Sequence, residues 1–242
     1  MNLRSRSRCP MAALQIAVVA LLIGGLAACT SQVVRPTTPA VTPSDTVGAA
    51  GAVRYDVDGA ASRVHVLVYR GGAMARLGHN HVVSSRSLSG ALYLHDDIAR
   101  SRIVLNLPVP SLIVDDPQSR LLEGPDFAAE VPEDAREGTR INLLRPEVLD
   151  GKSYPVIALE SAAVSGSREH PTLRVRVTIK GVTRDVTVPA AVREQGDRLV
   201  AEGEFDILQS DFGIAPFSVA LGALQVQDRL RVRFSIACRR QD

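Results

Sequence analysis

Apolar and polar residues alternate along most of the chain from residue 53 onward. In the segment Thr172–Lys180 (TLRVRVTIK), Leu173, Val175, Val177 and Ile179 alternate with Arg174, Arg176, Thr178 and Lys180. The same period of two recurs in Ser62–Arg70, Leu88–Leu94, Ser101–Leu107, Val182–Val192, Arg198–Leu208 and Gln227–Ala237, and Tyr154–Val164 is a more uniformly apolar segment. Because successive side chains of a strand point to opposite faces, this pattern predicts antiparallel strands with one face in a core and the other in water.

The stretch between Pro117 and Gly151 breaks this pattern. Asp116 before Pro117 is typical of a helix cap, and a second helix is expected to begin at Pro132 and run toward residues 143–144. About eight strands with one helical insertion fit a mainly β fold with a single closed antiparallel barrel, since closure removes exposed sheet edges. A β-sandwich has the same period and is the alternative. A barrel of this size is either filled by side chains or holds one small ligand.

The N-terminus has the features of a bacterial export signal. Arginines at positions 4, 6 and 8 precede the apolar run 11–26, which ends in Leu26-Ala-Ala-Cys29, the pattern of a lipobox whose cysteine is acylated. The run is too short to favour a permanent membrane span. We therefore expect a signal peptide over 1–28, lipid attachment at Cys29, a disordered Pro/Thr-rich tether over 29–52 and a folded domain over 53–239. The expected location is the periplasmic side of a bacterial membrane, and Thr30 after the cysteine favours the outer membrane.

Charge and cysteine content narrow the possible functions. The chain has 28 basic and 26 acidic side chains, and loss of the three N-terminal arginines leaves 25 against 26. A nearly neutral mature protein without a basic cluster is a poor candidate for nucleic-acid binding, which depends on neutralising phosphates. Of three cysteines, only Cys238 lies inside the expected domain, so the domain has no internal disulfide and its stability comes from its core.

Several short motifs, in this order along the chain, resemble the YceI-like family of lipid- or polyisoprenoid-binding proteins. They are Tyr55-Asp-Val-Asp58 with Ser62, Tyr154-Pro155 before an apolar segment with Ser161, Ile179-Lys-Gly-Val-Thr183, Ser210-Asp-Phe-Gly-Ile214, and Val226-Gln-Asp228 before the last strand. The resemblance implies a lipocalin-like antiparallel barrel with a helix packed at one end. It also implies a long isoprenoid chain held in the lumen and no shared catalytic constellation.

On this basis we expect a non-catalytic, lipid-anchored carrier or sequestering protein for an isoprenoid-like or fatty ligand. The lumen residues are taken from the apolar side of each strand, with two phenylalanines at one end: Val64, Val66, Val68, Leu92, Leu94, Phe205, Phe234, Phe212 and Phe217. The expected partners are the apolar ligand and the membrane that holds the acyl anchor. Formation of a homodimer is kept as a further option. The alternative function is an envelope interaction or structural module with a filled barrel.

One histidine pair raises the possibility of metal binding. His79 and His81, in Gly78-His-Asn-His81, would share a face if extended, and His65 and His95 could add to them. The favoured interpretation is two hydrogen-bonded or exposed histidines in a turn, because no cysteine or carboxylate lies nearby at zinc-site spacing. A periplasmic metal-binding protein is kept as an alternative. No nucleophile elbow, phosphate loop or dinucleotide fingerprint is present, so we expect neither an enzyme nor a cofactor.

Overall fold

The computed structural model describes residues 51–241. The expected signal peptide, Cys29 and nearly all of the tether lie outside these residues. The described part has thirteen strands: β1 (Val53–Val57), β2 (Arg63–Gly71), β3 (His81–Ser85), β4 (Ser89–Leu94), β5 (Arg102–Pro108), β6 (Ile113–Val114), β7 (Val156–Gly166), β8 (Pro171–Ile179), β9 (Val182–Pro189), β10 (Ala191–Gln195), β11 (Arg198–Leu208), β12 (Ser218–Val219) and β13 (Leu224–Arg240). Two α-helices, α1 (Pro117–Leu121) and α2 (Glu133–Leu144), fill the predicted insertion. None of the helices between residues 51 and 241 is long and apolar enough to cross a bilayer.

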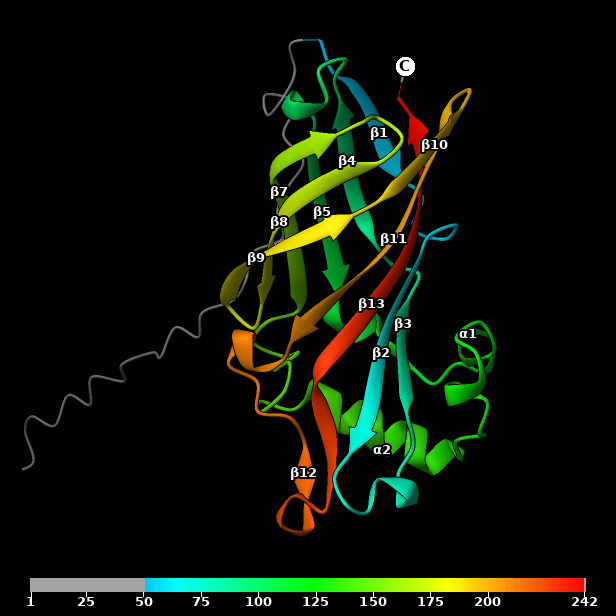
Figure 1. Cartoon of the computed structure of the whole chain (residues 1–242), viewed down its shortest axis with the longest axis vertical. Coiled ribbons are helices and arrows are strands. Elements are labelled where there is room, and N and C mark those ends of the chain that lie inside the picture. The colour runs from blue at the N-terminus through cyan, green and yellow to red at the C-terminus, as the bar shows by residue number, and fades with distance from the viewer. Residues whose placement is uncertain (1–50, 242) are drawn as a thin grey trace, which may run out of the picture. The chain divides into compact units, whose positions relative to one another are not determined.

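All strand pairs in the sheet are antiparallel, and their hydrogen-bonded order is β6-β3-β2-β13-β1-β4-β5-β7-β8-β9. β11 pairs with both β10 and β13, and β12 pairs with the first residues of β13. The long strand β13 pairs with β2 and then β1 along one edge, and with β12 and then β11 along the other. Figure 1 shows β13 running between these two groups of strands.

The prediction of a closed barrel of about eight strands needs two corrections. No ladder joins β9 to β11 among the described residues, although the chain bends after Pro189 into β10, which does pair with β11. Close approach at this bend depends on Gly203, where a Cβ atom would lie 2.4 Å from the Pro189 carbonyl oxygen. The structure has more strands than predicted because β1, β3 and the two-residue strands β6 and β12 lie outside the segments with clear alternation, and because the predicted strand Val182–Val192 is divided at this bend.

The turn between β1 and β2 is tied to β13 by Ser62, which is fully buried. Its hydroxyl donates to the Asp58 carbonyl oxygen at 2.7 Å and accepts from the Ala237 amide at 3.0 Å. The Asp58 amide also donates to the Ala237 carbonyl oxygen at 2.9 Å. These bonds satisfy backbone groups at the point where β13 changes partner from β2 to β1.

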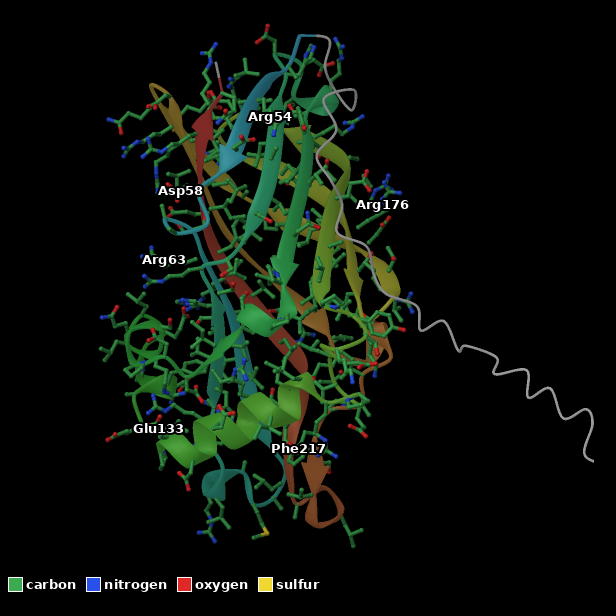
Figure 2. All side chains as sticks on the ribbon, turned by 180° about the vertical axis from the view of Figure 1, so that it is seen from behind. Arg54, Asp58, Arg63, Glu133, Arg176 and Phe217 are labelled. Atoms are coloured by element: carbon green, nitrogen blue, oxygen red, sulfur yellow. The ribbon has the colours of Figure 1, made fainter. Side chains whose placement is uncertain are left out.

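The helical insertion follows the sequence prediction closely. The Asp116 carboxylate accepts from the Ser119 amide at 2.9 Å and so caps α1, as expected. Helix α2 begins with Glu133 and Asp134 in its first turn, where acidic side chains favour the helix dipole. It lies across one end of the sheet, and its Leu143 and Leu144 pack against the main core (Figures 1 and 2).

The outer face of β2 and β3 is covered rather than exposed to water. Leu67 and Val82 are fully buried there against Phe127, which is 1% exposed and lies in a short 3-10 helix (Pro125–Phe127) after α1. Tyr69 packs its ring edge-on to Phe127, with ring centroids 5.4 Å apart. The prediction that one face of every strand would meet water was therefore wrong here, because the insertion folds back over the sheet.

We expect Phe127→Ala to destabilise the domain by about 3–5 kcal/mol, since it opens a cavity under a fully buried ring. The matched control is Leu121→Ala in α1, because Leu121 is 80% exposed and its truncation removes little buried surface. Denaturant unfolding of both variants measures the difference. Equal unfolding free energies for the two variants would show that the covering segment contributes nothing to stability.

Candidate functional site: an apolar cavity

The inward side of the sheet encloses an apolar cavity of about 190 Å³. Strand β8 shows how the sequence builds its wall: Leu173, Val175, Val177 and Ile179 are buried, while the residues between them face outward. The cavity residues other than Tyr93, Ser101, Arg102 and Arg168 are all apolar. Since a water molecule occupies about 30 Å³ in the liquid and needs polar partners, this space suits an apolar guest better than water.

Six of the nine predicted lumen residues line this cavity: Val64, Val66, Leu92, Leu94, Phe205 and Phe234. Phe205 and Phe234 are neighbours across the β11–β13 ladder, with ring centroids 6.3 Å apart and the rings tilted by 57°. The structure thus brings together predicted residues from β2, β4, β11 and β13. Much of the remaining lining lies on β5, β7 and β8, where the alternation of apolar and polar residues in the sequence already indicated the inward side chains.

Val68, Phe212 and Phe217 do not line the cavity. Val68 follows Val66 on the same face of β2, but it packs into the main core beyond the cavity. Phe212 is 2% exposed and belongs to the same core, so it fills space at the end of the sheet. Phe217 is 44% exposed because it precedes β12, which pairs only with the first residues of β13.

A charged cluster lies at one end of the cavity. The Arg168 guanidinium, in the loop between β7 and β8, lines the cavity and donates two hydrogen bonds to the Glu194 carboxylate on β10, at 2.5 and 3.0 Å. These bonds hold the pKa of Glu194 below its usual value and raise the pKa of Arg168. The Tyr55 hydroxyl lies 3.4 Å from Glu194, and burial together with that carboxylate raises the pKa of Tyr55. Arg168 and Val192 line both the cavity and a hollow on the outer surface. The cluster of Arg168, Glu194 and Tyr55 therefore lies at the boundary between the apolar cavity and the solvent.

The two histidines proposed as metal ligands belong to different surroundings. His81 Nδ1 lies 2.6 Å from the Asp115 carboxylate, which also accepts from the Val82 amide and from Arg120. His79 makes an edge contact with His81 at 6.3 Å between ring centroids. Of the further candidates, His65 pairs with Glu123, and His95 accepts from the Asp97 amide. Within residues 51–241, no group of three or more His, Cys, Asp or Glu side chains is arranged to hold a metal ion.

Cys238 is also part of the core. It is 1% exposed and packs with Tyr55, Leu94 and Leu199 beside the cavity. Burial raises the pKa of its thiol to about 12. Because the thiolate is the reactive form, Cys238 is a structural residue.

A family model for the YceI-like domain matches residues 55–238. The chain belongs to the YceI-like family. No match was found among curated proteins.

Solved structures with a similar fold include BcnA of Burkholderia cenocepacia, with 18% sequence identity, a TM-score of 0.55, and coverage of 75% of this chain and 99% of that one. A polyisoprenoid binding domain from Saccharophagus degradans, implicated in plant cell wall breakdown, has 14% identity, a TM-score of 0.49 and coverage of 77% and 98%. The YCEI protein of Campylobacter jejuni has 14% identity, a TM-score of 0.47 and coverage of 64% and 82%.

The motifs that this YceI-like domain showed in sequence meet in pairs at the ends of strands. Ser210, from Ser-Asp-Phe-Gly-Ile, donates through its hydroxyl and its amide to the carboxylate of Asp228, from Val-Gln-Asp. Lys180 and Gly181 form the two-residue turn between β8 and β9, and both have positive φ, as primed hairpin turns require. A Cβ at Gly181 would lie 2.9 Å from the ring of Tyr154, from the Tyr-Pro motif. These motif residues therefore fix turns of the YceI-like fold.

The lowered pKa of Asp115 predicts that the folding stability of the domain depends on pH. Burial raises its pKa, but hydrogen bonds from His81, Val82 and Arg120 outweigh burial and hold the pKa below the ordinary value of 3.8. A pKa lowered by folding contributes stability above the unfolded pKa, and this contribution is lost as the pH falls through the folded pKa. Asp115→Asn should therefore be less stable than the parent at neutral pH, and the difference should shrink below about pH 4.

Denaturant unfolding from pH 7 to pH 3 measures this difference. Glu133→Gln is the control, because the Glu133 side chain is 93% exposed. A gap between Asp115→Asn and the parent that stays constant over this range contradicts the assignment.

Proposed function

We propose that this YceI-like protein binds an apolar, chain-like ligand in its cavity and acts as a non-catalytic carrier or sequestering protein. The observation that carries the proposal is the cavity wall, which apart from Tyr93, Ser101, Arg102 and Arg168 consists of apolar residues, mostly Val, Leu and Ile with two phenylalanines. A wall of flexible aliphatic side chains gives dispersion contacts without fixing the orientation of the guest, which suits a hydrocarbon chain. The Saccharophagus degradans domain, described as polyisoprenoid binding, points to the same class of ligand.

We further propose that the domain is exported and held on the periplasmic side of a bacterial membrane by an acyl chain on Cys29. The support is the sequence: a basic N-terminus, a short apolar run and the Leu-Ala-Ala-Cys29 stop. The Pro/Thr-rich segment before Val53 would act as a tether that lets the domain extend away from that membrane. An acyl anchor places the cavity next to a source of apolar chains.

Ligand binding is tested by narrowing the cavity. Ala201 on β11 lines the cavity, whereas its neighbour Val200 faces outward. Ala201→Phe should lose most of the lipid that co-purifies with the parent and most of its affinity for a long polyprenol, because the new ring occupies the guest's space. Val200→Phe adds a comparable ring outside the cavity and should keep both. Native mass spectrometry and organic extraction measure the bound lipid.

A parent protein that carries no lipid after gentle purification and fails to bind the polyprenol would remove the carrier proposal. Equal lipid content in the Ala201→Phe and Val200→Phe variants would place the lipid elsewhere on the protein. A normal unfolding midpoint for Ala201→Phe distinguishes lost binding from lost folding.

Acylation is tested separately with Cys29→Ser. The parent should incorporate labelled palmitate in growing bacteria and fractionate with the envelope. The variant should incorporate none, because a hydroxyl does not replace the thiol in forming the thioether. Cys9→Ser, inside the expected signal peptide, is the matched control and should be labelled normally. Labelling of Cys29→Ser would show that the anchor is not at this residue.

A further inference from the structure

Two loops lie side by side at the end of the sheet that carries β12. One joins β2 to β3 and contains a short 3-10 helix (Ala75–Leu77), and the other runs through β12 to the start of β13. The Met74 amide donates to the Ala223 carbonyl oxygen at 2.7 Å, which ties the loops together. Both are at the lower end in Figure 1, and Figure 2 shows the labelled Phe217 there.

These loops expose large apolar side chains to solvent. We name them the apolar tip: Met74 (43% exposed), Leu77 (61%), Phe217 (44%), Val219 (41%) and Leu221 (109%). Leu221 lies in the turn between β12 and β13 with a positive φ of 54°, a conformation that is costly for a leucine. Adjacent exposed apolar residues on two connected loops are typical of an interaction surface, since isolated exposed residues need no explanation but a cluster does.

Within the two loops, residues 72–80 and 212–227, Arg76 is the only Asp, Glu, Lys or Arg side chain. No acidic residue occurs between Asp58 and Asp96, and residues 212–227 contain no charged residue at all. The exposed Arg76 lies between Met74 and Leu77, and Arg70 at the base of the same loop donates to the Gly78 carbonyl oxygen. Figure 2 shows Glu133, in the acidic first turn of α2, toward the same end of the molecule as Phe217.

We propose that the apolar tip inserts into the interfacial layer of an anionic phospholipid bilayer. The apolar side chains would enter the boundary between headgroups and acyl chains, while Arg76 and Arg70 would remain at the level of the lipid phosphates. A bilayer fits this surface because it offers apolar depth and negative charge together, and it needs no shaped pocket. The proposal rests on the tip alone and stands whether or not the cavity binds a ligand.

The absence of tryptophan from the chain allows a reporter at one position. In the full chain, Leu221→Trp should show emission shifted to shorter wavelength when vesicles of phosphatidylglycerol and phosphatidylcholine are added. Vesicles with brominated acyl chains should quench it. The control is Gln195→Trp, at the exposed last residue of β10, at the opposite end of the sheet. Its emission should remain that of a water-exposed indole. Both variants have the same N-terminal segment, so binding through that segment affects both reporters equally.

The charge contribution is tested in the Leu221→Trp background. Adding Arg76→Glu should weaken quenching by anionic vesicles, whereas adding Arg184→Glu, at an exposed position of β9, should not. Equal quenching of the two tryptophan reporters, or no change of either with vesicles, overturns the proposal. A shift at position 221 that occurs without vesicles and grows with protein concentration also overturns it, because the tip would then bind a second copy of the chain.

Discussion

The pairing of β13 along both of its edges is the constraint on which the rest of the structure depends. Its inward residues Val232, Phe234 and Ile236 form part of the cavity wall, because their side chains share one face of the strand. Its outward residues Arg231 and Arg233 pair with Asp206 and Glu204 on β11. Such exposed ion pairs contribute little stability each. They do favour one register, since a shift by one residue would turn the arginines toward the apolar cavity.

Arg233 also links this strand to the helical insertion. Its guanidinium donates to the buried Glu123 carboxylate at 2.7 Å, and the other oxygen of Glu123 lies 2.5 Å from His65 Nδ1 on β2. Removing one member would leave a buried charge without its partner, which is more costly than losing an exposed pair. The insertion is therefore held over the outer face by the ion pairs of Glu123 with His65 and Arg233, by the pair of Asp115 with His81, and by Phe127, which packs on Leu67 and Val82.

Sequence alternation predicted the strands well wherever one face meets water. It failed for β3, whose last four residues are all buried, because covering both faces of a strand removes the polar half of the pattern. For the same reason the pattern placed Leu67 in water, although Phe127 covers it. The alternation along β2 predicted which face Val64 and Val66 would occupy. Val68 lies on the same face of the strand but outside the cavity. Where a cavity ends depends on the curvature and closure of the sheet, which no local pattern records.

The break in hydrogen bonding between β9 and β11 has a mechanical consequence. Elsewhere around the cavity, neighbouring strands are joined by backbone ladders, so widening the wall there would break several hydrogen bonds at once. Between β9 and β11 the described residues form no ladder, so separating these two strands breaks no ladder hydrogen bonds. The gap between β9 and β11 is therefore the part of the cavity wall that can widen without breaking a backbone ladder.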